Sequence, residues 1–122
     1  MTKLNEYHIK DTVRTPDGLT VHLARERRQI TGRFDYYIDF ACLPAVMDVS
    51  EKLINQAIKW HMPLRAAYGV AIMPDNTRIR LFKLSAIKEL IISLGAEIKQ
   101  PQEALAICNT AENYVKERGH EH

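Results

Sequence analysis

Cysteine and long apolar runs are both scarce in this chain. Its two cysteines, Cys42 and Cys108, are too far apart in sequence for a metal-binding or redox pair. We expect two buried thiols in a reducing compartment, with a disulfide between them as the alternative. No segment approaches the ~20 apolar residues that span a bilayer, and the N-terminus lacks the apolar run of a signal peptide. The protein is therefore expected to be cytoplasmic, with no membrane partner.

The motifs of common enzyme classes are also missing. The sequence contains no Gly-x-Ser-x-Gly and no His-Glu-x-x-His, and its five glycines fall at turns, at helix ends and near the C-terminus. Five histidines occur outside any ligand or nucleophile motif. His8 and His22 are expected on a solvent-facing side of a sheet with Asp35, Tyr37 and Asp39, where no pocket forms. We expect a protein without catalytic activity, metal or cofactor.

The first half of the chain alternates apolar and polar residues, as half-buried strands do. The alternation runs through Tyr7 and Ile9, then through Leu19–Leu23, then through Phe34–Phe40. Pro16-Asp17-Gly18 is a typical turn sequence between the first two segments. Three antiparallel strands with one face toward a core are therefore predicted.

The middle of the chain changes to helical periodicity. A helix is predicted to begin at Asp48, with Glu51 in a capping box, and to end before Pro63. Residues 68–84 surround a Pro-Asp-Asn turn and predict a second hairpin. The alternative is that residues 64–73 continue the helical region.

Two more helices follow, one after Ser85 that ends at Gly95 and one from Pro101 to about Gly119. The predicted order is β-β-β-α-β-β-α-α, which indicates an α+β fold. We expect an antiparallel sheet, a three-stranded meander plus a second hairpin, covered by about three helices. Residues 1–119 are predicted to form a single α+β domain and residues 120–122 a frayed tail.

Four arginines are concentrated around a predicted turn at Thr31-Gly32, although the formal charge of the whole chain is only +2. Such a cluster either keeps an edge hairpin soluble or contacts an external partner through its guanidinium groups. Arg78 and Arg80 are predicted on one face of a later strand. They either form a second basic patch or simply face solvent. The candidate contact residues are Arg25, Arg27, Arg28, Arg33, Arg78 and Arg80.

The register of this basic hairpin can be restricted further. Residues that oppose each other across an antiparallel pair share a side, so Leu23 is expected opposite Ile38 or Phe40. The Ile38 register places like charges opposite each other, whereas the Phe40 register pairs Arg28 with Asp35. We prefer the Phe40 register, and we expect the hairpin to project as a two-stranded arm beyond the helix that covers the sheet.

Aromatic and methionine residues gather around the predicted second hairpin. Such residues are enriched in interface cores, but they also fill the core of a single domain. A homodimer with two-fold symmetry is the oligomer that this cluster would favour. The residues are Trp60, Tyr68, Met73 and Phe82.

Two functions are compatible with these features. The first is a small non-enzymatic binding protein, a regulator or inhibitor that acts on a protein partner through the projecting basic hairpin. The alternative is a nucleic-acid-binding regulatory or architectural protein that uses the same arginines. In size and in its lack of catalytic motifs the chain resembles the small accessory proteins that bacteria, phages and other mobile elements encode. That resemblance is one of type and assigns a role to no residue.

Overall fold

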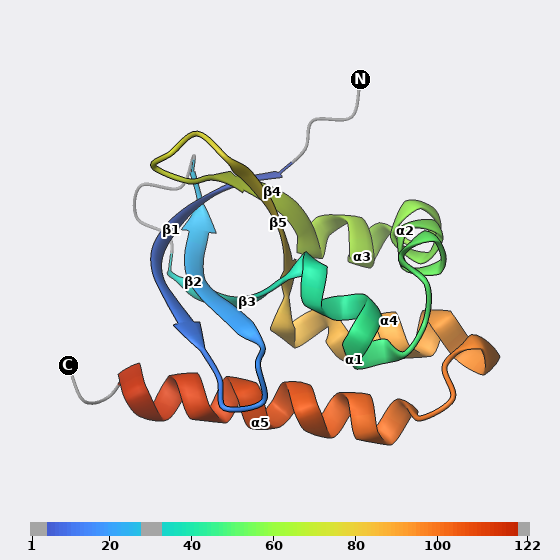
Figure 1. The fold of residues 1–122 in the computed structure, drawn as a ribbon. Helices are drawn as coiled ribbons and strands as arrows, with labels where there is room; N and C mark the ends of the chain where they lie inside the picture. The colour runs from blue at the N-terminus through green and yellow to red at the C-terminus, as the bar shows by residue number, and fades with distance from the viewer. Residues whose placement is uncertain (1–4, 28–32, 120–122) are drawn as a thin grey trace.

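The alternating segments of the first half form strands, and helices follow them (Figure 1). The computed structural model describes residues 5–27 and 33–119. The strands in these residues are β1 (Asn5–Arg14), β2 (Thr20–Glu26), β3 (Asp35–Asp39), β4 (Tyr68–Ile72) and β5 (Arg78–Lys83). The α-helices are α1 (Leu43–Met47), α2 (Glu51–Trp60), α3 (Met62–Ala67), α4 (Ile87–Leu94) and α5 (Pro101–Gly119). Short 3-10 helices lie at Phe40–Cys42, Leu84–Ala86 and Gly95–Glu97.

A parallel pairing between β1 and β4 closes the sheet into a barrel. Asn5–Tyr7 lies beside Gly69–Ala71, and the strands follow one another around the barrel in the order β1-β2-β3-β5-β4. The other neighbouring strands are antiparallel. The predicted open antiparallel sheet, a meander plus a hairpin under helices, is therefore wrong. Its error is the assumption that one face of the sheet meets the helices and the other meets water.

A β-bulge in β1 contributes to this closure. The register with β2 shifts after Ile9, so that Ile9 opposes Ala24 whereas Thr12 opposes His22, and Lys10 has no opposing residue in that register. A bulge bends its strand and increases the local twist. The inward positions of β1 consequently do not follow a single alternation, which is why the sequence pattern gave no sign of a barrel.

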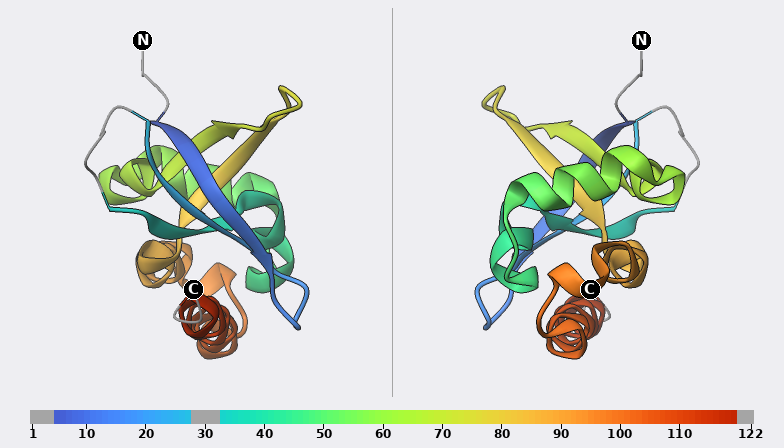
Figure 2. Two further views of the ribbon diagram at one scale, coloured as in Figure 1. Left: turned by 90° about the vertical axis from the view of Figure 1, so that its left-hand side faces the viewer. Right: turned by 90° about the vertical axis from the view of Figure 1, so that its right-hand side faces the viewer.

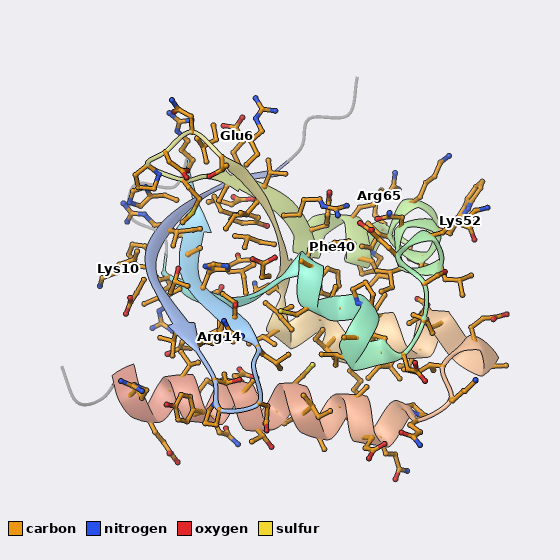
Figure 3. The ribbon with its side chains drawn as sticks, in the orientation of Figure 1. Glu6, Lys10, Arg14, Phe40, Lys52 and Arg65 are labelled. Atoms are coloured by element: carbon orange, nitrogen blue, oxygen red, sulfur yellow. The ribbon has the colours of Figure 1, made fainter. Side chains whose placement is uncertain are left out.

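The barrel encloses an apolar core of its own, which contains Tyr7, Ala24, Tyr37, Ala71 and Leu81. The interior of a small barrel is narrow and is filled by side chains, as Figure 3 shows. Two alanines leave room for the two tyrosine rings, whose centroids lie 4.6 Å apart. Tyr37, expected on a solvent-facing side, is only 4% exposed.

The outside of the barrel and the helices form a second, larger core. Ile38 and Phe82 contribute to it from the strands, and Ile54, Leu90 and Ala111 contribute from the helices. Figure 1 shows α5 running along one end of the barrel, with α1, α2 and α3 grouped on one side. Both faces of β3 are therefore buried in its middle.

Local sequence signals determine several helix ends. Ser50, rather than the predicted Asp48, caps α2, because its hydroxyl accepts a hydrogen bond from the Leu53 amide at 3.3 Å. Asp48 has a φ of 52° and follows the end of α1. Gly95, with a φ of 53°, follows α4, and Pro101 begins α5, as the sequence predicted.

The region from residue 64 to residue 73 contains parts of both predicted alternatives. Helix α3 continues to Ala67, and β4 begins at Tyr68. The predicted hairpin of β4 and β5 is confirmed, and the Met73 amide donates to the Thr77 carbonyl at 2.8 Å across its turn. The side views in Figure 2 show this hairpin extending beyond the rest of the barrel.

The pairing of β2 with β3 differs from both predicted registers. Leu23 opposes Tyr36, and the last pair is Ala24 with Asp35. Asp35 forms an ion pair with Lys83 at 3.3 Å. The neighbouring strand β5, which the prediction did not place beside β3, therefore supplies a partner for this carboxylate.

The basic hairpin is not a free arm in the part that the structure describes. Beyond the last pair with β3, the chain after β2 stays beside β1, and the Arg27 amide donates to the Glu6 carbonyl at 2.9 Å. Arg28 and the predicted Thr31-Gly32 turn lie outside the described residues. Arg25 and Arg27 are consequently part of the barrel wall.

Replacing Tyr37 by alanine tests the closed barrel. We expect Tyr37→Ala to lower the free energy of unfolding by about 3 kcal/mol or more, because it empties the barrel interior. The exposed Ile92, at 68%, supplies the control, and Ile92→Ala should change stability by less than about 0.5 kcal/mol. Urea denaturation followed by circular dichroism measures both. Equal, small effects would indicate that Tyr37 faces water, as an open sheet requires.

Candidate nucleic-acid interface

Two cations from neighbouring strands lie over one phenylalanine ring on the outside of the barrel. The Lys10 Nζ is 5.0 Å and the Arg25 Cζ is 4.8 Å from the centroid of Phe34. Arg25 opposes the exposed His8, whereas the adjacent residue Ala24 is buried in the barrel. Lys10 points away from the barrel in Figure 3. The ring quadrupole attracts both cations and holds them on this outer surface.

The same type of contact continues from β3 onto α5. Tyr36 lies two residues after Phe34, and the Lys116 Nζ is 6.0 Å from its ring centroid. Further along α5, the Arg118 guanidinium lies 5.6 Å from the ring of Tyr114 and donates to its hydroxyl at 2.7 Å. We call this set the cation–aromatic strip. It consists of Lys10, Arg25, Phe34, Tyr36, Tyr114, Lys116 and Arg118.

Carboxylates moderate the positive charge of the strip and its surroundings. Glu112 pairs with Lys116 at 3.0 Å, and this hydrogen bond raises the pKa of the Lys116 ammonium. Beside the strip, Arg27 pairs with Glu6 at 3.5 Å, and both side chains are mostly exposed. Exposed pairs of this kind contribute little to stability, so a ligand anion can compete with them.

A cavity of about 300 Å³ opens beside Tyr36, between the outer surface of β1, β2 and β3 and the last turns of α5. This volume is at the lower end of the range for ligand pockets. The cavity adds a concave feature to the strip, because Tyr36 and Arg118 belong to both. Its lining residues are Asp11, Thr12, Val13, Arg14, Leu23, Tyr36, Val115 and Arg118.

His22 is 2% exposed, so its predicted place on a solvent-facing side is wrong. Its Nδ1 is 2.8 Å from the Thr12 hydroxyl, and its Nε2 is 3.5 Å from Oδ2 of Asp39. The interaction with His22, followed by the hydrogen bond from the Ala41 amide, lowers the pKa of the Asp39 carboxyl. A nucleophile next to a base and an acid would have the same composition. The burial of the ring instead indicates a polar contact that holds β1, β2 and β3 together.

The structure places most of the hairpin arginines near the strip. Arg25 belongs to it, Arg27 directly follows β2 and lies beside the start of β1, and Arg33 is exposed next to Phe34. The two candidate arginines of β5 lie elsewhere. Arg80 lies 4.4 Å from the centroid of Phe40 and pairs with Glu51 of α2, whereas Arg78 is exposed on the projecting hairpin. The five candidate arginines that the structure describes therefore do not form one patch.

The predicted dimer residues do not form a continuous surface. Phe82 is fully buried, and Tyr68 packs edge-on against Phe40 with centroids 5.4 Å apart. Met73 is half-buried at the hairpin turn. Trp60 is 75% exposed at the end of α2, next to Met62, which is 71% exposed. We call Trp60 and Met62 the α2–α3 corner.

Other functional chemistry is sparse in the described part of the chain. Cys42 and Cys108 are free, and burial raises the pKa of Cys108 to about 12, so this thiol stays protonated at neutral pH. Among residues 5–27 and 33–119, no three His, Cys, Asp or Glu side chains are grouped to hold a metal ion. No helix within these ranges is long and apolar enough to cross a membrane.

No family model matches this sequence, and no curated protein or solved structure matches it either. A fold alone does not determine a function, and no similar protein of known function supplements the fold here. The chemistry of the surface is therefore the basis for any functional proposal.

Sequence reasoning missed most of the cation–aromatic strip. The preferred register places Arg27 opposite Tyr36, where it could stack on the ring, but the cation beside Tyr36 is Lys116 of α5. The sequence singles out neither Lys116 nor Arg118. A cation next to an aromatic ring leaves no sequence signal when the two lie on different elements. Lys116 and Arg118 also lie in the last turn of α5, where the helix dipole favours cations. Their presence there is therefore explained without a role in binding, so the sequence does not indicate one.

The pair of His22 and Asp39 gives a pH-dependent contribution to stability. Because the pKa of Asp39 is lower in the folded chain, the contribution is present above the unfolded pKa of about 4 and is lost as pH falls toward the folded value. Asp39→Asn should cost about 1–2 kcal/mol at pH 7, and the difference from wild type should shrink near pH 3. Urea midpoints at both pH values measure this, with Asp17→Asn in an exposed turn as control. A difference that stays constant between pH 7 and pH 3 contradicts the assignment.

Proposed function

We propose that the protein binds single-stranded nucleic acid through the cation–aromatic strip and acts as a binding or regulatory protein without catalysing a reaction. One observation carries this proposal: Phe34, Tyr36 and Tyr114 lie along one surface, each with a cation over or beside its ring. Proteins that bind single strands combine a basic groove with aromatic or guanidinium surfaces on which bases stack. This surface has both components.

Single strands fit this surface better than a duplex does. A duplex groove is usually entered by a helix or by a projecting β-ribbon. In the residues that the structure describes, Arg25 and Arg27 belong to the barrel wall, and the hairpin that projects, β4 with β5, carries one exposed arginine, Arg78. Unpaired bases need no such element, because their faces are open to stacking.

Stacking is available even though Phe34 already has cations over it. A guanidinium that lies on an aromatic ring can also stack against a base, and guanidinium N–H groups bond phosphate oxygens well. The Arg25 guanidinium lies 4.8 Å from the Phe34 ring centroid. Arg25 belongs to the paired strand β2, so its backbone is ordered before a ligand binds.

The modest charge of the strip limits its affinity and salt dependence. If Lys10, Arg25 and Arg118 of the strip and Arg14 of the adjoining cavity each neutralise one phosphate, the logarithm of the binding constant should fall with a slope of about −3 against the logarithm of salt concentration. Binding should therefore be detectable at low salt and weak at physiological salt. A protein of this type would contact several nucleotides at a time.

A paired deletion of charge tests the strip. Lys10→Ala/Arg25→Ala should weaken binding of a fluorescent oligothymidylate of about ten nucleotides by about tenfold or more. The salt slope should become less steep by about 1.4, because two phosphate contacts are lost. Fluorescence anisotropy at several salt concentrations measures both quantities.

The control removes the same two residue types from other surfaces. Lys88→Ala/Arg78→Ala changes the net charge equally, on α4 and on the projecting hairpin. This variant should bind like the wild type. Absence of binding by the wild type at low salt, or equal loss in both variants, would rule out the strip as the nucleic-acid interface.

The α2–α3 corner favours a second candidate, a role in binding a protein partner. Trp60 and Met62 are large apolar side chains that are almost fully exposed, and tryptophan is the residue type most enriched in binding hot spots. Lys59 lies 5.8 Å from the Trp60 ring centroid, and Arg65 contacts the Met62 sulfur at 3.2 Å. An apolar pocket with an acidic rim would complement this corner. A second copy of the chain would bring like charges together.

Crosslinking distinguishes a different protein partner at the α2–α3 corner from a second copy of this chain. A photoreactive amino acid in place of Trp60 should crosslink a partner in the native host, whereas the same substitution at Ile92, also exposed and apolar, should not. Mass spectrometry identifies the product. Crosslinks to a second copy of this chain, or equal recovery from both positions, would contradict a partner at the corner.

A further inference from the structure

The cavity beside Tyr36 brings charged groups of both signs next to apolar walls. Val13 and Leu23 of the strands and Val115 of α5 supply apolar surface. Arg14 comes from the end of β1 and Arg118 from the end of α5, so two arginines from different elements line the cavity. In Figure 3, Arg14 lies between the barrel and α5.

This composition selects a planar ligand with an anionic group. The valines, the leucine and the Tyr36 ring can cover the faces of a flat, weakly polar group such as a nucleobase. Two guanidinium groups suit a phosphate, whose oxygens accept several charged hydrogen bonds at once. The Tyr114 hydroxyl accepts from Arg118 at 2.7 Å, which restricts where that guanidinium can lie.

Asp11 gives the cavity its selectivity. Its Oδ1 accepts a hydrogen bond from the Thr12 amide at 2.8 Å, which orients the carboxylate. An ionised carboxylate can only accept hydrogen bonds, so a ligand edge that faces it has to donate. The two arginines can only donate hydrogen bonds, so they favour acceptor groups on the ligand. Asp11 is the lining residue that disfavours an acceptor group on the part of the ligand that faces it.

We propose that this cavity is a subsite for a nucleobase with an exocyclic amino group, whose phosphate lies between Arg14 and Arg118. The proposal deepens the proposed function and rests on it, since the cavity shares Tyr36 and Arg118 with the strip. Cytosine, adenine and guanine carry such an amino group. Thymine and uracil carry a carbonyl oxygen at the position of that amino group, and a carboxylate repels it, so their single N3–H donor lies between two acceptors.

The test compares oligonucleotides that differ at one base. The probes are an oligothymidylate of about ten nucleotides and the same oligomer with one central guanosine or one central cytidine. The wild-type protein should bind both substituted oligomers about tenfold more tightly than the oligothymidylate, because one base-edge contact is gained. Fluorescence anisotropy at low salt gives the dissociation constants.

Asp11→Asn isolates the selective contact. The amide can both donate and accept, so the preference for the substituted oligomers should fall to about twofold or less, while affinity for oligothymidylate stays equal or rises slightly. Glu117→Gln, a matched change on α5 outside the cavity lining, should keep the wild-type preference. Circular dichroism confirms that both variants fold.

Guanosine monophosphate distinguishes the cavity from the strip. It should shift the NMR signals of residues 11–14 and of Val115, which line the cavity and are not part of the strip, in the wild-type protein. Equal affinity for all three oligomers, unchanged by Asp11→Asn, would overturn the subsite and leave the strip in place. A response to the mononucleotide without oligonucleotide binding would support the subsite and reject the proposed function. Absence of any binding would reject both.

Discussion

The parallel pairing of Asn5–Tyr7 with Gly69–Ala71 is the constraint on which the other surfaces of this protein depend. By closing the sheet it encloses one face, which can then hold only a few side chains. The opposite face has to supply the main core with the helices and also any binding surface at the barrel wall. A closed sheet also leaves fewer exposed strand edges, so partners contact side chains rather than open backbone.

Closure also accounts for the position of the cations. The bulge at Lys10 directs this side chain outward, while β2 places Arg25 beside it and the chain before β3 places Phe34 under both. Lys10 and Arg25 belong to paired strands, and Phe34 directly precedes Asp35, which pairs with Ala24 of β2. A surface built in this way is ordered before a ligand arrives, which reduces the entropic cost of binding.

Local signals in the sequence were sufficient for most individual elements. The first three strands, the second hairpin and the last helix follow from alternation, turn residues and Pro101. The closure was not predictable in this way, because a pairing between β1 and β4 depends on residues far apart in the chain. For the same reason, the sequence predicts that Tyr37 and His22 face solvent. They alternate with apolar residues as in a strand with one solvent-exposed face, and they are buried because the sheet closes into a barrel.

The candidate site also combines residues that the sequence pattern indicates with residues that only the tertiary structure brings together. Arg25, Arg27 and Arg33 were singled out because charge without nearby core residues is visible in sequence. Their aromatic and helical neighbours depend on tertiary packing, which brings the last turns of α5 beside Tyr36 of β3 and Leu23 of β2.

The last turns of α5 change from buried to exposed residues beside the outer surface of the strands. Val115 is the last buried residue of α5, and Lys116 and Arg118 follow it at the surface. There the helix no longer seals the outer face of the sheet, and the cavity beside Tyr36 opens between them. Since these residues add little to the core, substitutions among them are expected to alter binding with little change in stability. The change from buried to exposed residues along the last turns of α5 thus separates the binding surface from the stabilising core.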